Sequence, residues 1–432
     1  MSDIKIAESF PRYTAHDPAA PIWCVTPTLD GCIHRFFDTP PFSPSGRYLA
    51  ALRLPFEDRL PNAGDEAEIV LVDLAEGGER VVATTRGWEP QLGANLNWGP
   101  DDTALIFNDV EPGEWVPFAV KLNPHTGQRE RLAGTVYHAS PDGQTLASAD
   151  LTRMGFTQPG YGVVVPDEHR QRAQGLAEDD GLWLTDVPSN TRRLAASIRQ
   201  IVDAAGPEEL RASPEDFEVY GFHAKWNPPG DRLIFTLRWF PAGASTRDAF
   251  LDQQTADWKV RFGVYTLRPD GTDIQLAVGP EHWAKRGHHI NFTPDGRGLS
   301  MNLGGWVDGH ALSLVGCALD GTGLAPITSA VPGSGHPSVH PTGMMLTDVY
   351  AHEAGLSYGD GTTPLRWIDP TRGTEQAIAR IHNGTPFDAT PLRLDPHPAW
   401  DRTWQWVAFN AMDQGQRRVY VMDMRGLLGS TS

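Results

Sequence analysis

A hairpin with a turn of the Pro, Asp and Gly type recurs seven times, and no other feature limits the possible fold as strongly. In each copy a short apolar stretch precedes the turn and another follows it, which is the pattern of an antiparallel β-hairpin. A third apolar stretch and a second turn follow each hairpin. The copies cover residues 42–52, 97–107, 139–149, 225–235, 291–301, 338–348 and 399–409.

Seven units of about four strands predict an all-β fold, a seven-bladed β-propeller. The repeats occupy the whole chain, so we expect a single domain over residues 1–432. The last unit has no clear fourth strand, and we expect a strand within Ile4–Phe10 or Ile22–Val25 to close the ring. The widest gap between hairpins contains "TRRLAASIRQIVDAAGPEELRA", which predicts a partly helical insertion at about 151–220.

Composition excludes two kinds of partner. The formal net charge is -18, and non-specific nucleic-acid binding needs a basic surface instead. No stretch approaches the 18 apolar residues of a membrane span. The first residues lack the basic start and apolar run of a signal peptide, so we expect a cytoplasmic protein.

Histidine recurs at one equivalent position of the repeat. Five residues before the turn proline, or before Arg402 in the last unit, four consecutive units carry it. If this position starts the innermost strand, the four imidazoles converge at one mouth of the central channel. The seven residues at this position are Thr39, Asn95, Val136, His223, His289, His336 and His397. Four histidines off this column are expected to have no role in a site: His138, His282, His288 and His340.

One carboxylate turns part of this column into a possible metal site. Asp395 lies two residues before His397, and side chains two apart on a strand share a face. His336 from the preceding unit can join them. Two imidazoles and a carboxylate suit a divalent cation, with manganese or calcium expected. The alternative, that the histidines only fill the channel, stays open.

These motifs resemble those of the oligogalacturonate lyase family and related propeller polysaccharide lyases, including enzymes that cut rhamnose–glucuronate linkages. The family's "His-Glu-Phe-Trp-x-Pro-Asp-Gly" hairpin is similar to "HINFTPDG", and its "Ser-His" hairpin to "GHPSVHPTG". Its "His-Pro-His-Pro-Ser-Phe" resembles "DPHPAW", and its closing strands resemble "VAFNAMDQGQRRVYVMDM". The resemblance covers residues 255–425, whereas the Pro-Asp-Gly hairpins are shared by many TolB-like propellers.

The resemblance implies roles for individual residues. His289 would be the base that abstracts a proton, and His336 and His397 would bind the metal. Asp395 stands where the family has a further histidine ligand, and Leu392 stands where it has a glutamine. A family arginine that precedes the base corresponds loosely to Arg261.

The implied reaction is β-elimination in an anionic, uronic-acid-containing oligosaccharide. The base removes the proton at C5, and a metal ion or an arginine stabilises the developing enolate-like anion. The product is a 4,5-unsaturated uronate. His223, one blade before His289, is a candidate to bind substrate or to help protonate the leaving oxygen.

Further substrate-binding candidates lie outside the column. His34 and Arg35 precede the first hairpin, and Arg35 could hold a uronate carboxylate through two hydrogen bonds. Arg153 and Tyr161 start the insertion, where a tyrosine could act as an acid or stack on a sugar. Arg238 is a similar candidate. For each of them an ordinary surface or packing role remains the alternative.

Two other functions stay open. A metal-dependent sugar hydrolase or lactonase could use the same channel mouth and would give a product without a new double bond. A non-catalytic binding propeller needs no histidine column. A serine hydrolase is disfavoured because the seven units use the whole chain and leave no room for a hydrolase domain.

Overall fold

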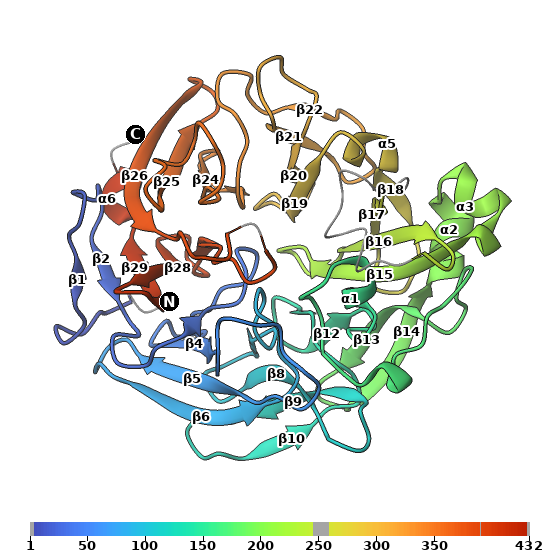
Figure 1. Cartoon of the computed structure of the whole chain (residues 1–432), viewed down its shortest axis with the longest axis horizontal. Helices are drawn as coiled ribbons and strands as arrows, with labels where there is room; N and C mark the ends of the chain where they lie inside the picture. The colour runs from blue at the N-terminus through green and yellow to red at the C-terminus, as the bar shows by residue number, and fades with distance from the viewer. Residues whose placement is uncertain (1–3, 245–258, 389, 430–432) are drawn as a thin grey trace.

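The computed structural model describes residues 4–244, 259–388 and 390–429. Seven antiparallel sheets stand in a ring, as Figure 1 shows, which confirms the predicted seven-bladed β-propeller. We number the sheets as blades one to seven, starting from the sheet that contains β3.

Blade one consists of β3 (Cys32–Ile33), β4 (Tyr48–Arg53), β5 (Ala67–Asp73) and β6 (Glu79–Thr85). Blade two consists of β7 (Asn97–Trp98), β8 (Leu105–Val110), β9 (Pro117–Leu122) and β10 (Arg129–Arg131). Blade three consists of β11 (His138–Ala139), β12 (Thr145–Ser148), β13 (Gly181–Asp186) and β14 (Thr191–Ser197). Blade four consists of β15 (Phe217–Trp226), β16 (Leu233–Pro241), β17 (Arg261–Leu267) and β18 (Gln275–Val278). Blade five consists of β19 (Gly287–Phe292), β20 (Gly298–Leu303), β21 (Ser313–Ala318) and β22 (Ala325–Pro326). Blade six consists of β23 (Ser338–Val339), β24 (Met345–Thr347), β25 (Thr362–Asp369) and β26 (Thr374–His382).

Blade seven joins the two ends of the chain. Its strands are β27 (Ala399–Trp400), β28 (Trp406–Asp413), β29 (Gln416–Asp423), β2 (Ile22–Cys24) and β1 (Arg12–Tyr13). Strand β2 pairs with β29, with Ile22 opposite Met422, and the blue and red strands lie side by side in Figure 1. The prediction of a closing strand within Ile22–Val25 is therefore confirmed, whereas residues 4–10 form no strand.

The hairpin turns fold as their sequence predicts. In the turn after β19, the Thr293 hydroxyl donates to the Asp295 carboxylate at 2.6 Å, and the Gly296 N–H donates to the Thr293 carbonyl at 2.8 Å. Gly296 has φ +69°, in the left-handed region that glycine adopts at little cost. A Cβ there would lie 2.4 Å from Pro229 of the preceding blade, so the turn also needs glycine for close packing.

Helices are few and short. They are α1 (Met154–Thr157), η1 (Asp167–His169), α2 (Ile198–Ala205), α3 (Glu208–Ala212), η2 (Pro214–Asp216), α5 (Pro280–Trp283) and α6 (Arg425–Gly429). The predicted insertion at 151–220 contains five of these, from α1 to η2, in two groups that flank β13 and β14. In Figure 1, α2 and α3 lie at the rim of the ring and α1 lies nearer its centre. No helix in the described part of the chain is long and apolar enough to cross a membrane.

Large apolar side chains pack between neighbouring blades. Trp367 of blade six and Trp400 of blade seven belong to one buried cluster, with ring centroids 5.9 Å apart. Trp226, Phe292 and Trp400, each at the end of the first strand of its hairpin, are all buried. Because blades meet through such cores, the innermost strands are held at fixed positions around the central axis.

Blade one interrupts its innermost strand. The predicted hairpin closes, since Phe42 bridges Leu49 and the Ser43 N–H donates to the Tyr48 carbonyl at 2.8 Å. Only the end of β4 pairs with β3, where Ile33 lies opposite Leu52. Residues 34–41 therefore leave the innermost strand as a loop, which we call the central loop. Its Phe36 ring contacts histidines of blades five, six and seven. The central loop thus fills part of the space that the ring encloses.

Candidate active site

Irregular backbone aims the histidines of the column. The ladder between β19 and β20 shifts register between His288 and Asn291, which is a β-bulge. His289 has φ 62° and His397 has φ 49°, left-handed values that are rare for residues other than glycine. Bulges and left-handed residues concentrate where a side chain must be turned out of the regular strand direction. The strained backbone at His289 and His397 therefore sets the orientation of these two rings.

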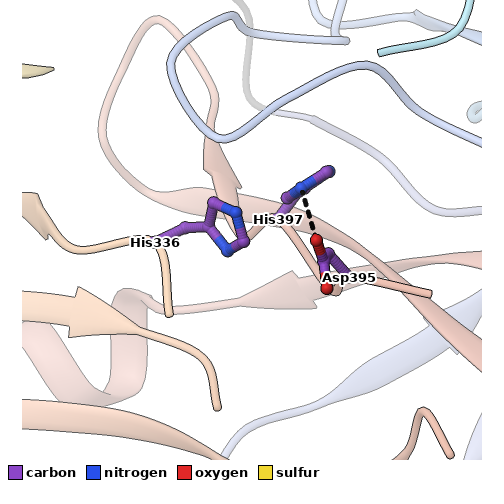
Figure 2. A group of neighbouring side chains, drawn as sticks. All are labelled: His336, Asp395 and His397. Carbon is purple, nitrogen blue, oxygen red and sulfur yellow. Dashed lines mark ion pairs between the residues drawn. The ribbon is translucent and has the colours of Figure 1, made fainter. Parts of the chain in front are cut away.

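His336, Asp395 and His397 form a buried group whose ligand atoms all lie within 4.8 Å of one another (Figure 2). Nε2 of His397 lies 3.7 Å from Oδ2 of Asp395. Nε2 of both histidines and Oδ2 of Asp395 accept no hydrogen bond in the described structure, although the Arg393 guanidinium lies 2.8 Å from that oxygen. The structure thus brings together the three residues predicted to bind a metal.

The donor set fits a divalent cation. Buried polar atoms are normally hydrogen-bonded, so the two imidazole nitrogens left without such bonds beside the Asp395 carboxylate call for a partner. Imidazole and carboxylate together are a common ligand set for divalent transition metals, and the carboxylate also suits calcium. Burial lowers the pKa of His397 well below its ordinary value, which keeps its ring neutral, as metal binding requires.

His289 lies directly beside this group. Its ring stacks on His336 with 3.7 Å between centroids. Its Nδ1 lies 2.5 Å from the Gly335 carbonyl oxygen and 2.7 Å from Nδ1 of His288. A carbonyl oxygen only accepts, so Nδ1 of His289 carries the proton and Nε2 keeps the lone pair. Burial, and then the neighbouring His336, lower the pKa of His289 well below its usual range, so the ring is neutral.

A cavity of about 1570 Å³ opens next to this group, between blades four, five and six. His289 lines it, and so do several basic side chains. The basic residues, histidines included, are His223, Arg238, Lys259, Arg261, Arg286, His288, His289, His310, His352 and Arg393. The acidic lining residues are fewer: Glu209, Glu281, Glu353 and Asp388. Five arginine and lysine side chains thus face four carboxylates, so in a chain with a net charge of -18 this cavity is far less acidic than the protein as a whole and can take an anionic ligand.

Four of the predicted residues besides His289 line this cavity. His223 lies at its floor, its ring 4.5 Å from that of Phe222. Arg238 stacks on Phe222 and donates to Gln158 at 2.6 Å. Arg261 forms an ion pair with Glu209 at the outer wall. Tyr161 completes the set, and burial raises its pKa to about 12.

The structure does not bring the other three predicted residues to the cavity. Arg35 is buried in the central loop, where it pairs with Asp38 at 3.4 Å and donates to the Tyr137 carbonyl. Arg153 pairs with Asp180 at 2.9 Å and is not among the residues that line the cavity. His34 is fully buried beneath blade seven, and burial lowers its pKa to about 4. The central loop turns inward to fill the ring, and this removes His34 and Arg35 from the mouth.

Three functional candidates were missed from the sequence. Asp348 accepts hydrogen bonds from Nδ1 of His336 at 2.9 Å and from the His397 N–H at 3.1 Å. Arg393 pairs with Asp395 through two nitrogens and also lines the cavity. Tyr350 lines the cavity with its hydroxyl 3.4 Å from Nε2 of His289. Burial raises the pKa of Tyr350 well above its ordinary value.

Of the four histidines expected to have no role in a site, one lies in it. His288 contacts His289 and lines the cavity, so the expectation that it has no place there was wrong. His138 accepts from the Trp226 N–H at 2.9 Å, and His340 bonds with Thr342 at 2.8 Å. His282 lies 3.3 Å from the Glu281 carboxylate.

The chain is similar in structure to two solved oligogalacturonate lyases. One, an oligogalacturonate lyase in complex with manganese, has a TM-score of 0.62 and 16% sequence identity over 98% of this chain and 98% of that chain. The other, from Vibrio parahaemolyticus, has a TM-score of 0.63 and 14% identity over 98% and 97%. No protein-family model and no curated protein matches the sequence. The resemblance expected from the motifs is thus confirmed as a shared fold, and it extends over nearly the whole chain.

Proposed function

We propose that the protein is a lyase that cleaves uronic-acid-containing oligosaccharides by β-elimination. The observation that carries this proposal is the position of His289. Its ring is neutral, Nδ1 is held by the Gly335 carbonyl, and Nε2 keeps the lone pair that can take a proton, at the wall of a cavity lined by five arginine and lysine side chains. Similarity to two oligogalacturonate lyases supports the same class of reaction.

Each residue then has a task. Nε2 of His289 removes the C5 proton of the uronate. Arg393 lines the cavity beside it and binds the uronate carboxylate, whose charge would otherwise oppose loss of that proton. Arg238 and Arg261 line the same cavity and bind further anionic groups of the oligosaccharide.

His336, Asp395 and His397 would hold a divalent cation, either manganese or calcium. When bound, it would supply positive charge that stabilises the anion formed at the uronate carboxylate. The manganese in one of the similar structures supports manganese as the first metal to test.

The test is ultraviolet absorbance of the 4,5-unsaturated product during incubation with oligosaccharides of galacturonate and of glucuronate. We expect absorbance to rise with at least one substrate, to fall on chelation, and to be lost in His289→Ala. His340→Ala is the matched control, because His340 bonds within its own hairpin and to the Trp404 carbonyl. New reducing ends without absorbance would instead identify the metal-dependent hydrolase. Binding without any product would identify a binding propeller.

A further inference from the structure

Two of the three predicted metal ligands, Asp395 and His397, lie on a segment without regular structure. The described residues between β26 and β27, 383–398 without 389, form no strand. We call residues 391–398 the ligand segment. A buried backbone group in a strand is satisfied by the ladder, whereas a buried one in a loop needs a donor of its own. The position of both ligands therefore depends on the side chains that hold the ligand segment.

Three successive carbonyl groups of the ligand segment accept hydrogen bonds from two side chains that are distant in sequence. Nε2 of Gln91 donates to the Pro391 carbonyl at 2.8 Å and to the Arg393 carbonyl at 3.0 Å. Carbonyl oxygens only accept, so the NH₂ group of Gln91 faces them and both of its protons are used. The Arg417 guanidinium donates to the Leu392 carbonyl between them. The ligand segment is thus held at each of these three residues.

Both donors are buried and are themselves held in place. Gln91 is 2% exposed and Arg417 is 1% exposed. Gln91 lies between β6 and β7, where its backbone N–H donates to the Glu89 carboxylate at 2.8 Å. Arg417 belongs to β29, and its Nε donates to the Glu57 carboxylate at 2.7 Å. The ligand segment is therefore held by side chains from two separate parts of the ring.

The metal site leaves little tolerance for a shift of the ligand segment. Asp395 follows Arg393 by two residues, and its carbonyl accepts from the side chain of Asn410 at 3.2 Å. Its Oδ2 lies 3.7 Å from Nε2 of His397. A metal–ligand distance must agree with its ordinary value to about 0.2 Å. A displacement of a fraction of an ångström at the three held carbonyls would therefore change the fit of a cation.

We propose that Gln91 is a positioning residue of the metal site, which holds the ligand segment so that Asp395 and His397 face His336, and that Arg417 supports it. This inference rests on the metal site and not on the reaction in the proposed function. Gln91 is not among the residues that line the cavity, and it carries no charge that would attract or repel a cation. Its effect on a bound cation therefore comes through the ligand segment.

The first experiment measures manganese binding by Gln91→Met in the whole protein. Methionine is unbranched like glutamine but has no donor, so the Pro391 and Arg393 carbonyls would be buried without one and the segment would shift. Titration calorimetry should show about 10–100-fold weaker binding than in the wild type. At saturating manganese, the electron paramagnetic resonance spectrum should also change, because it depends on the arrangement of the ligands.

The outcome does not depend on cleavage of any substrate. Unchanged affinity together with an unchanged spectrum in Gln91→Met would overturn the proposal. A wild-type protein that binds neither manganese nor calcium would overturn the proposal and the metal site with it. Absence of an unsaturated product would count against the proposed reaction alone.

Asn108→Leu separates positioning from ordinary stabilisation. Asn108 is also buried, and its NH₂ group donates to the Val136 carbonyl at 2.7 Å, away from the metal ligands. Denaturant unfolding without metal should show that Asn108→Leu and Gln91→Met both lose stability, whereas only Gln91→Met should lose manganese affinity. Equal affinities in the two variants would mean that Gln91 has a structural role only, and the proposal would fail.

Arg417→Lys tests the supporting contact and keeps the positive charge, which by itself affects the affinity for a cation. A lysine ammonium lacks the planar fork with which Arg417 reaches the Glu57 carboxylate and the Leu392 carbonyl together. We expect manganese binding about tenfold weaker than in the wild type. Wild-type affinity in Arg417→Lys would show that this contact does not position the site and would remove Arg417 from the proposal.

Discussion

The Asp348 carboxylate accepts a hydrogen bond from Nδ1 of His336 at 2.9 Å, so Nε2 of His336 keeps the lone pair that faces Asp395 and His397. Asp348 also accepts from the backbone N–H groups of His336 and His397. One buried carboxylate thus sets the tautomer of one ring and ties together the two segments that carry the histidines.

Asp348→Asn should weaken manganese binding by about 10–100-fold. The amide can accept from the backbone, but its NH₂ group cannot accept from Nδ1 of His336, so the proton moves to Nε2 and blocks that ligand. Titration calorimetry measures the affinity. Asp401→Asn is the control, since Asp401 is a buried carboxylate in the last hairpin, away from the site. An unchanged affinity in Asp348→Asn would show that His336 is not a ligand.

Arg393→Gln should change metal and substrate binding in opposite directions. The guanidinium lies 2.8 Å from Oδ2 of Asp395, so its charge opposes a cation at the same oxygen. Manganese affinity should rise about tenfold, roughly 1.4 kcal/mol. The KM for the uronate oligosaccharide should rise because a carboxylate-binding group is lost. Arg372→Gln, at an exposed pair with Asp369, should change neither quantity. A rise in KM with weaker manganese binding would place Arg393 in support of the metal site instead.

The fold could be predicted because its signal is local and repeated. Each hairpin carries its own turn residues and its own alternation, so seven weak signals support one architecture. The central loop was not predicted, because Phe42 and Leu49 pair as the repeat predicts, while β3, which pairs with the end of β4, lies earlier in the chain. A sequence pattern does not show which of two apolar stretches pairs with a given strand.

The sequence predicted those site residues that occupy equivalent positions of the repeat. His289, His336 and His397 meet because their blades are adjacent, and Asp395 follows from the two-residue alternation. The same alternation extends to Arg393, two residues before Asp395, and to Tyr350, two residues after Asp348. The sequence could not show whether Arg35 binds a ligand or pairs with Asp38, because that depends on where the central loop turns.

Lys225→Met should destabilise the protein by about 3–5 kcal/mol at neutral pH, because it leaves the Asp38 carboxylate buried without its closest cation. The Lys225 ammonium lies 2.7 Å from Asp38, and both side chains are 1% exposed. Burial alone raises the pKa of Asp38, but Lys225 and Arg35 outweigh it and hold that pKa below the ordinary value. The pair's contribution is therefore present above the unfolded pKa of about 3.9 and is lost as the pH falls through the folded value.

Denaturant unfolding at neutral pH and near pH 4 checks this prediction. The difference between wild type and Lys225→Met should shrink near pH 4. Without Lys225, burial raises the pKa of Asp38 in the variant, so protonation there removes the unpaired buried charge, whereas the wild-type pair stays ionised. Lys121→Met is the matched control, since Lys121 forms an exposed pair with Glu130 and should change stability by less than about 1 kcal/mol. A constant difference across pH would mean that packing, and not charge, sets the cost.

Glu89→Gln should make the protein more stable than the wild type above neutral pH. Burial raises the pKa of Glu89 to about 8, ahead of the backbone hydrogen bonds and distant arginines that lower it. The folded protein holds this proton while the unfolded chain, with a pKa of about 4.3, has lost it. Wild-type stability is therefore full below the unfolded pKa and falls by up to about 1.4 kcal/mol per pH unit as the pH rises toward the folded value. The uncharged glutamine removes this fall in the free energy of unfolding with pH. The control is Glu130→Gln at the exposed surface, which should show the same fall as the wild type. Parallel stability curves for wild type and Glu89→Gln between pH 5 and 8 would show that Glu89 is ionised in the folded protein.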